Sequence, residues 1–383
     1  MPETPTAAEL PAPPRRRRRH GRARAVFSSA LATALLAAPG ALPAVADGPA
    51  AAPLKVMTRN LSFGADLTPV FRATSGTELV QAVTAAYKNV QDTDFPERAL
   101  ALAGEIAGKD PQLVGLQEAA LWRSQTPSGP GAATHVEYDF VDILLRALAA
   151  RGRHYAVVAS VTDGDYEAPR ATPSGLQDVR LTDRDVLLAR TDLPRAYFSV
   201  GAPRSGSFAA RVTLTSPVLG TVVVPHGWVA VDATVRGRTT RVVSTHLETL
   251  SPAVQVLQAR ELLDGPLNTR LPSVLVGDLN SAAGGVGAEP GRTDTRTYGD
   301  LLAAGFTDAW TARHRGNPGF TCCQDASLHN TASTLRQRID YLLFRGGLTA
   351  LAAGRVGARP GDRTPSGLWP SDHAGVWGVL QPR

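Results

Sequence analysis

The sequence predicts one compact α/β domain in which mixed β-sheets are covered by helices. Three observations carry this prediction. From residue 54 onward, segments with the apolar spacing of helices interleave with apolar, strand-like runs. No internal repeat and no long linker interrupts them. Polar side chains stand at both the beginnings and the ends of these runs, so neighbouring strands must run in both directions if the side chains meet.

The first 46 residues have the organisation of a cleavable signal peptide. The basic run RRRRRHGRAR precedes the apolar stretch AVFSSALATALLAA, which is too short to span a membrane comfortably. Ala44-Val45-Ala46 is a small-residue cleavage motif, so we expect cleavage after Ala46 and a secreted protein. A membrane anchor is the alternative, and both the Sec and the twin-arginine routes fit the paired arginines. No later stretch is apolar enough to span a bilayer.

Removal of this segment changes the charge of the protein. The whole chain has a formal net charge of +6, but residues 1–46 hold seven of its arginines and two of its glutamates. The mature chain keeps 33 basic and 32 acidic residues, a net charge of +1. It therefore lacks the strong basic excess of a dedicated nucleic-acid binder.

The two cysteines, Cys322 and Cys323, cannot build a thiolate zinc cluster and form either a vicinal disulfide or two free thiols.

The expected elements follow a short leader, residues 47–53. Strands are expected where apolar runs are short, at 54–58, 113–117 and 274–277 and within 338–347 and 373–380. Helices are expected where apolar residues recur with helical spacing, at 77–90, 95–110, 140–151, 252–264 and 298–304. Ser251 is the expected N-cap of the fourth helix, with Pro252 at its first position. Between Tyr155 and Thr245 the pattern predicts short strands joined by turns.

The stretch VLVGDLNS ends an apolar strand with two polar residues. Residues two apart in an extended chain point the same way, so the carboxylate of Asp278 and the amide of Asn280 project together. An ordinary turn is the alternative, because Asp and Asn are common turn residues. The other strand boundaries favour a site, because they too carry polar side chains. The full set is Asn60, Glu118, His246, Asp278, Asn280, Asp340, Asp372 and His373.

Each member of this set also has an ordinary structural explanation. Asp340, for example, could form an ion pair with Arg338. Together, however, the residues make a chemically consistent group, because hard oxygen ligands suit Mg²⁺, Mn²⁺ or Ca²⁺. A histidine beside carboxylates also suits proton transfer near neutral pH.

Six motifs, TRNL, GLQE, STHLE, GDLN, RIDY and SDH, occur in the order found in the endonuclease/exonuclease/phosphatase superfamily, which includes deoxyribonuclease I. Over residues 54–380 the chain resembles an exported bacterial member of that group. The resemblance implies a four-layer α/β sandwich of two mixed β-sheets flanked by helices. It also implies that residues 54–383 form a single catalytic domain.

The resemblance further implies a metal site and a catalytic group. Glu118 would be the principal ligand of a divalent cation, most simply Mg²⁺, with Asn60 beside it and Asp372 completing the site. Asp278 would orient and help deprotonate the attacking water, and Asn280 would hold the phosphate or the water. His373, positioned by Asp340, would contact the phosphate or act as a base, and His246 would stabilise the phosphate from the opposite side.

Some features depart from the pattern of the family. The strand DRDVLLAR stands where relatives often have a small-residue segment with a polar group facing the site, and whether Asp185 takes the place of that group is open. His226 stands where many relatives have arginine, and its contact with substrate is also open. The insertion WRSQTPSGPGAATHVEYD, which follows shortly after Glu118, is expected to border the cleft and to shape specificity.

The leading functional hypothesis is a secreted, monomeric, divalent-metal-dependent phosphoesterase. It would hydrolyse phosphodiester bonds by metal-assisted attack of water, on a lipid, a small molecule or a nucleic acid. A secreted nuclease acting on DNA or RNA is the first alternative, and the near-neutral charge of the mature chain tilts against it. A non-catalytic surface or binding protein that retains the fold is the alternative of another class.

Overall fold

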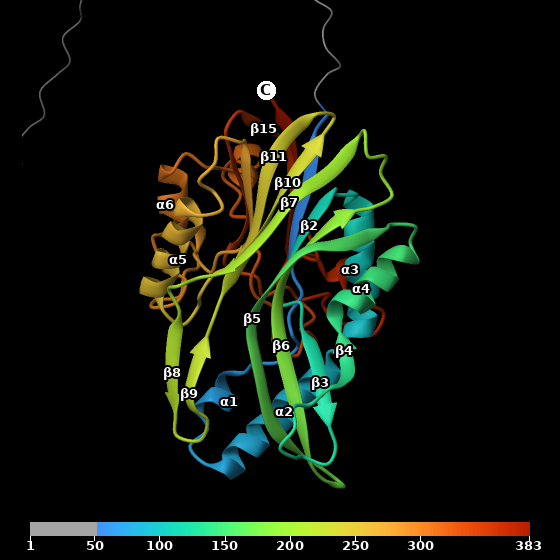
Figure 1. Ribbon diagram of the computed structural model, residues 1–383, viewed down its shortest axis with the longest axis vertical. Coiled ribbons are helices and arrows are strands. Elements are labelled where there is room, and N and C mark those ends of the chain that lie inside the picture. The colour runs from blue at the N-terminus through green and yellow to red at the C-terminus, as the bar shows by residue number, and fades with distance from the viewer. Residues whose placement is uncertain (1–51) are drawn as a thin grey trace, which may run out of the picture. The chain divides into compact units, whose positions relative to one another are not determined.

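The computed structural model describes residues 52–383, so the expected signal peptide and its cleavage position lie outside the described residues. In the described part, two large β-sheets pack face to face and helices cover their outer faces (Figure 1). This arrangement confirms the predicted four-layer sandwich of mixed sheets.

The larger sheet has eight strands. Its order is β15, β16, β1, β2, β6, β3 and β4, and β5 pairs with β6. Strands β1 and β2 are parallel and the other pairs are antiparallel, as expected for a mixed sheet. The bounds are β1 (Leu54–Asn60), β2 (Leu113–Gln117), β3 (Leu121–Gln125), β4 (His135–Asp139), β5 (Tyr155–Thr172), β6 (Gly175–Arg190), β15 (Leu348–Val356) and β16 (Gly375–Pro382).

The smaller sheet has six strands in the order β13, β14, β12, β11, β10 and β7. Here only β11 and β12 run parallel. The bounds are β7 (Phe198–Ser207), β10 (Gly227–Val235), β11 (Arg238–His246), β12 (Ser273–Asp278), β13 (Thr307–Asp308) and β14 (Asp340–Arg345). A separate hairpin, β8 (Val212–Ser216) and β9 (Gly220–Val224), leaves this sheet between β7 and β10.

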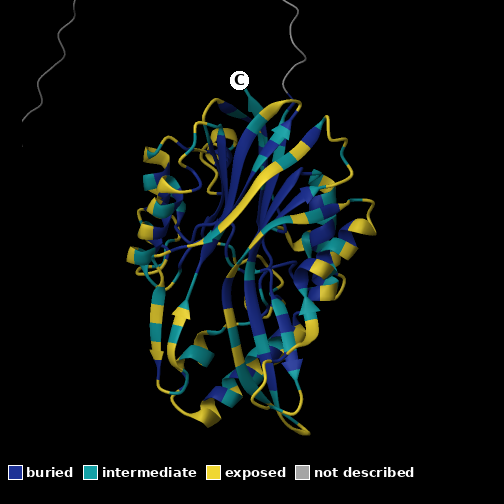
Figure 2. Cartoon of the chain, in the orientation of Figure 1, coloured by how far each residue is buried: buried dark blue, intermediate teal, exposed yellow. Residues whose placement is uncertain are grey.

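The central strands are buried on both faces, which explains why they are apolar at nearly every position. Val56 points into the core between the sheets, whereas its neighbour Met57 packs under the helices. In β12, Val274 and Val276 enter the core between the sheets and Leu275 faces the opposite helical layer. Figure 2 shows the resulting buried centre of both sheets.

Helices cover each sheet on its outer side. Three cover the larger sheet, namely α2 (Gly76–Asp92), α3 (Phe95–Lys109) and α4 (Phe140–Ala149), and two cover the smaller one, α5 (Pro252–Asp264) and α6 (Thr297–Ala303). Short helices α1 (Thr68–Arg72) and α7 (Ala309–Arg313) were not predicted. Ser251 caps α5 as predicted, because its Oγ accepts a hydrogen bond from the amide of Val254 at 3.4 Å. No helix within residues 52–383 combines the length and the apolar character that a membrane crossing needs.

The prediction of short strands from Tyr155 onward is wrong for its first part. Strands β5 and β6 have 18 and 16 residues and form one long hairpin. The sequence around Gly164 looks like a turn, but the chain there continues through a register shift between Thr162 and Gly164. Such irregularities bend a strand without ending it, and glycine is common at them.

Candidate active site

Predicted side chains from both sheets meet around one cleft with a volume of ≈ 360 Å³. Asn60 and Asp340 lie buried directly behind its surface. The predicted residues that line the cleft are Glu118, His246, Asp278, Asn280, Asp372 and His373. All eight predicted residues therefore gather in one region of the fold.

The mixed direction of the strands produces this convergence. Strand β12 runs parallel to β11 on one side and antiparallel to β14 on the other. The register places His246 opposite Asp278, and Asp278 opposite Asp340. The last residues of two strands and the first residue of a third therefore form one row at the sheet edge.

The turn after β12 depends on its glycine. Gly277 has φ of +141°, and a Cβ at this position would lie 1.9 Å from the backbone oxygen of Thr245. No side-chain movement can relieve a contact with a backbone atom, so only glycine fits here. Asn280 follows with φ of +47°, which asparagine tolerates better than most residues.

Asn60 connects the two acids of the site. Its Nδ2 donates to Glu118 Oε1 at 3.0 Å and to Asp278 Oδ2 at 3.3 Å. Its Oδ1 accepts a hydrogen bond from the amide of Ser62 at 2.9 Å. Asn60 therefore positions both carboxylates, and its predicted role as a metal ligand stays a prediction.

Asp278 lies between two histidines. Its Oδ2 is 3.6 Å from His246 Nε2 and 3.6 Å from His373 Nδ1. The backbone amide of Asn280 donates to Asp278 Oδ1 at 3.0 Å. His373 Nδ1 also lies 2.8 Å from Asp340 Oδ2, so Asp340 fixes the ring and leaves Nε2 for other partners. Arg338 pairs with Asp308 instead of Asp340, which removes the ion-pair explanation for Asp340.

Burial and neighbouring charges shift the ionisation of this group. Burial, with the charge of Asp340, raises the pKa of Asp278 to about 7. Burial opposes a charged imidazole at His373, but the carboxylates of Asp340, Asp278 and Asp372 together raise the pKa of this ring well above its usual value. Burial, together with the two neighbouring histidines, lowers the pKa of His246 well below its usual value, so this ring is neutral at pH 7.

The cleft has an excess of carboxyl groups, which suits a cation. Burial, then the charges of Asp372 and Asp183, raises the pKa of Glu118 to about 8. One arginine, Arg292, is the only Arg or Lys among the described residues that line the cleft. Eight carboxylates line it as well: Asp66, Glu118, Asp163, Asp183, Glu248, Asp278, Glu289 and Asp372. A donor set of carboxylate oxygens fits Mg²⁺, Mn²⁺ or Ca²⁺.

Two groups of side chains could hold such an ion. Glu118 and Asp372 form the first, on the side of the larger sheet. The second is a set of ligand atoms from Asp278, Asp340 and His373 that all lie within 4.8 Å of one another. An ion in the second group would compete with the 2.8 Å hydrogen bond between His373 and Asp340. The assignment of a metal to Glu118 and Asp372 stays a prediction.

The lining of the cleft also contains residues that the sequence did not assign. His226 is buried, with Nε2 3.7 Å from Glu248 Oε2 and its ring 5.4 Å from that of His246. Asp163 and Asp183 also line the cleft, whereas Asp185, whose role was open, is fully buried and does not line it. The alternation of side chains could have indicated Glu248, which lies two residues after His246 in STHLE.

The cysteine pair also reaches the cleft. Cys322 and Cys323 form a vicinal disulfide, and Cys323 Sγ lies 3.9 Å from His373 Nε2. The pair therefore borders the ring nitrogen that Asp340 leaves free.

The two packed mixed sheets with helices outside form the deoxyribonuclease I-like sandwich, which is a phosphoesterase fold. Residues 85–373 match the model of the Endonuclease/Exonuclease/phosphatase family, so the chain belongs to this family. Members of the family are hydrolases of phosphoester bonds and generally use a divalent metal. No curated protein matches the sequence.

The chain is also similar to solved structures, at low sequence identity. An endonuclease/exonuclease/phosphatase from Beutenbergia cavernae is 22% identical, with a TM-score of 0.50, and the match covers 86% of this chain and 72% of that one. A mannosyl-6-phosphatase from Bacteroides thetaiotaomicron is 17% identical, with a TM-score of 0.49 and coverage of 85% and 99%. TDP2 from D. rerio, solved with a single-strand DNA product, is 14% identical, with a TM-score of 0.48 and coverage of 86% and 99%.

Proposed function

We propose that the mature chain is an exported phosphodiesterase that requires a divalent cation. The observation that carries this proposal is the position of Asp278, whose carboxylate lies 3.6 Å from two histidines in a cleft rich in acids. A binding protein that only retained the fold would not need a buried acid between two buried histidines, because such groups destabilise a folded protein.

The cation would be held by Glu118 and Asp372, with Asn60 keeping Glu118 in place through its 3.0 Å hydrogen bond. A phosphodiester is an anion that repels hydroxide, and a bound divalent ion would offset that charge and stabilise the leaving oxygen.

The side chains around the scissile phosphate would carry out proton transfer and bind the phosphate. Asp278 has a pKa near 7, so its carboxylate can accept a proton from an attacking water at neutral pH. His373 uses Nδ1 to contact Asp340 and offers Nε2 to the phosphate or the leaving group. His246 is neutral and would donate a hydrogen bond without adding charge, and Asn280 would hold the phosphate or the water.

The test is hydrolysis of bis(4-nitrophenyl) phosphate by residues 47–383, with Mg²⁺, Mn²⁺, Ca²⁺ or a chelator. We expect turnover with at least one cation, none with the chelator, and a loss of about 100-fold or more in Asp278→Asn. Asp264→Asn, at an exposed position at the end of α5, is the matched control and should retain full activity. Full activity of metal-free protein would refute the proposal.

Export and the monomeric state have separate tests. Mass spectrometry of the secreted protein should find Asp47 as the first residue, and a start beyond Lys55 would contradict this because it removes part of β1. Size-exclusion chromatography with light scattering should give the mass of one chain.

A further inference from the structure

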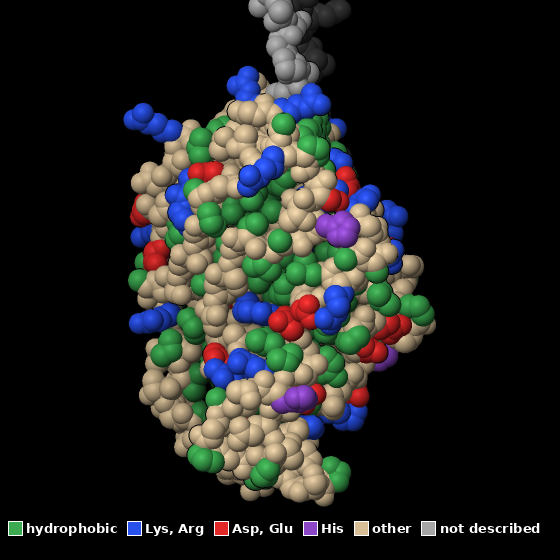
Figure 3. Space-filling model, turned by 45° about the vertical axis from the view of Figure 1, so that its right-hand side comes forward, with side chains coloured by type: hydrophobic (Ala, Val, Ile, Leu, Met, Phe, Trp, Pro, Cys, Tyr) green, Lys and Arg blue, Asp and Glu red, His purple; other side chains and the backbone are tan. Residues whose placement is uncertain are grey.

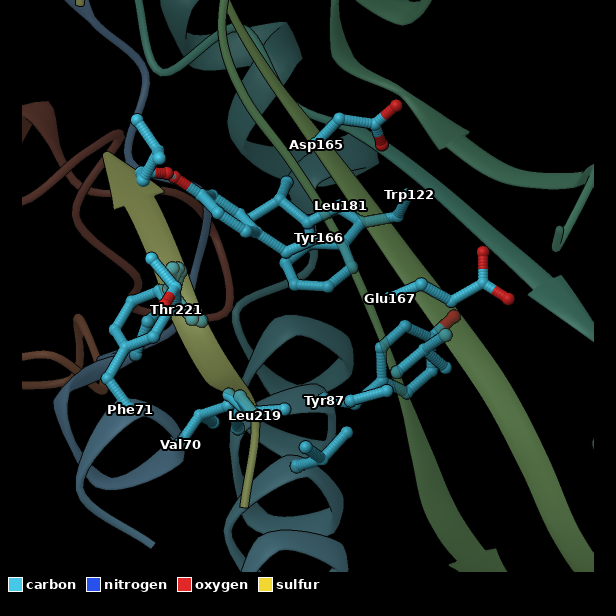
Figure 4. A pocket seen from close by; sticks show the side chains of 17 residues that line it. Val70, Phe71, Tyr87, Trp122, Asp165, Tyr166, Glu167, Leu181, Leu219 and Thr221 are labelled. Atoms are coloured by element: carbon cyan, nitrogen blue, oxygen red, sulfur yellow. Dashed lines mark hydrogen bonds between the residues drawn. The ribbon is translucent and has the colours of Figure 1, made fainter. Parts of the chain in front are cut away.

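A second cavity, with a volume of ≈ 350 Å³, lies beside the catalytic cleft. It is enclosed by α1, α2, strands β3, β5 and β6, and the β8–β9 hairpin, and none of the catalytic residues faces it. Figure 4 shows Val70 and Phe71 on one side, Tyr87 below, and Tyr166 with Leu181 above.

The walls of this cavity are mainly apolar. Phe71 and Tyr166 meet edge to face with ring centroids 5.6 Å apart, and Tyr87 meets Trp122 in the same way at 5.7 Å. Aliphatic side chains fill the rest of the lining, from Leu67, Val70, Val83, Val179, Leu181, Leu219, Val222 and Val223. A cavity of this size and composition is typical of a ligand pocket.

Of the six polar side chains that line the cavity, four are already paired, and the other two are the hydroxyl-bearing Tyr87 and Thr221. The carboxylates of Asp165 and Glu167 point away from the rings in Figure 4, and both form ion pairs with Arg180. Tyr166 donates its hydroxyl to the backbone oxygen of Val223 at 3.2 Å. Trp122 Nε1 donates to the backbone oxygen of Phe63 at 3.3 Å. Because these groups are already paired, few hydrogen-bond donors and acceptors remain to recognise the polar edge of a nucleobase. The cavity therefore suits an uncharged hydrocarbon.

The cavity adjoins the catalytic cleft. Four side chains line both spaces: Leu67, Phe71, Tyr166 and Leu181. A single ligand could therefore place a phosphate near Asp278 and extend an apolar group past the Phe71–Tyr166 pair.

We propose that this cavity binds the alkyl chain of a phosphodiester substrate, so that the enzyme selects diesters in which one alcohol is a long-chain alkyl or acyl-bearing group. This inference rests on the proposed function and adds its substrate class. The alkyl chain of the substrate would lose its hydration when it packs against the apolar walls. Each buried methylene contributes up to about fourfold in affinity, the equivalent of ~0.8 kcal/mol.

The test compares methyl, butyl and octyl 4-nitrophenyl phosphate as monomers in solution. We expect kcat/KM to rise with the length of the alkyl chain, by at least about 100-fold from methyl to octyl. This is far below the upper limit set by about fourfold for each of the seven added methylenes, so partial burial is enough to produce it. Equal kcat/KM for the three esters would overturn the proposal while the proposed function stands.

Variants of cavity-lining residues test whether the preference for the octyl ester arises in this cavity. Ala86→Trp fills the cavity from α2, and Val70→Asp places a charge in its wall from the short helix α1. In both, the ratio of kcat/KM for the octyl and methyl esters should fall at least tenfold. Ala85→Trp is the matched control, because this neighbour on α2 is exposed and does not line the cavity, and it should keep the wild-type ratio. A wild-type ratio in Ala86→Trp and Val70→Asp would also overturn the proposal.

A binding measurement separates this inference from catalysis. Calorimetry should show that octyl phosphate binds at least about 100-fold more tightly than methyl phosphate, and that Ala86→Trp removes most of this difference. If no diester is hydrolysed but this binding preference is present, the proposed phosphodiesterase function is wrong and the proposal that the cavity binds an alkyl chain is supported. Equal binding of the two phosphates would overturn the pocket.

Discussion

Asp278 interacts with side chains from three other segments, namely Asn60 at the end of β1, His246 at the end of β11 and His373 before β16. Each distance is 3.3–3.6 Å, so none of these contacts is as short as the 2.8 Å contact between His373 and Asp340. Asp278 is thus available for a proton from water, while Asp340 is committed to the ring of His373.

This division of roles predicts unequal effects of two substitutions. His373→Ala should lower kcat by about 100-fold or more, because it removes a group that contacts the reacting phosphate. Asp340→Asn should lower kcat less, because an amide oxygen can still accept the hydrogen bond from Nδ1 and hold the ring. The measurement is steady-state hydrolysis of a diester at saturating cation.

Thermal melts would confirm that both variants fold. The role assigned to His373 is wrong if His373→Ala retains the wild-type kcat, and Asp340 has a direct catalytic role if its variant is the more damaged one.

His226 predicts a dependence of stability on pH. Burial lowers the pKa of His226 to about 4, against about 6.5 in an unfolded chain. A depressed pKa gives stability that is fully present above about pH 6.5 and is lost as the pH falls through 4. The shift corresponds to at most about 3 kcal/mol, so wild type should lose more stability than His226→Gln between pH 7 and pH 4.

Denaturant unfolding of both proteins at several pH values measures this difference directly. Burial also lowers the pKa of His246, so the variant should still lose some stability in acid. Parallel curves for the two proteins would show that His226 is solvated or charged in the folded state.

The sequence indicated the residues that belong to short ordered motifs, including Glu118, Asp278 and His373. It did not indicate Asp163 or Asp183, because these acids lie within the long β5–β6 hairpin, where the local pattern resembles turns. It also could not show that Asn60 turns its oxygen toward Ser62, since that orientation depends on the backbone beyond β1.

At the scale of elements, β12 positions most of the catalytic group, and its glycine makes this possible. Gly277→Ala should destabilise the protein by about 2 to 5 kcal/mol, because it combines an unfavourable φ with a collision against Thr245 backbone. Activity should fall even where the variant folds, because Asp278 is the next residue. Denaturant unfolding and kcat are the measurements.

Gly299→Ala, inside α6, is the control for Gly277→Ala. Apart from its own helix backbone and chain neighbours, no atom lies within 4 Å of a Cβ there. Alanine is also favoured over glycine in a helix, so this variant should be neutral or slightly stabilised. Equal behaviour of the two variants would mean that the close approach of Gly277 to Thr245 is relieved by backbone movement.

The helices and central strands were predictable because their apolar spacing is regular and their ends carry caps such as Ser251. The long β5–β6 hairpin was not predictable. Its strands are partly exposed and bent by register shifts, and they contain glycine and aspartate, which are also the common residues of turns. The cavity beside the cleft depends on this hairpin and on the unpredicted helix α1, so sequence patterns alone could not place it.

At the scale of the whole molecule, charge bears on the choice between a nuclease and an enzyme for smaller esters. Figure 3 shows Lys and Arg spread over the visible face among acidic and neutral side chains. The arginines that would be candidates for a phosphate-binding surface form ion pairs with acids, at Arg204–Asp232, Arg292–Glu289, Arg296–Asp300, Arg336–Glu289 and Arg338–Asp308. The acid beside each of these arginines offsets part of its charge, so the pair attracts phosphate less strongly than an unpaired arginine would.

The chain should therefore make few contacts with the backbone of a long nucleic acid. Binding to duplex DNA falls with salt at a slope of about −0.9 per phosphate contacted on logarithmic axes, and we expect roughly 2 to 4 contacts here. The measurement is binding of Asp278→Asn, which should not cleave, to duplex DNA over a salt series with the cation held constant. A slope of about −6 or steeper would mean that six or more phosphates are bound. That result would make a secreted nuclease the better description of this enzyme.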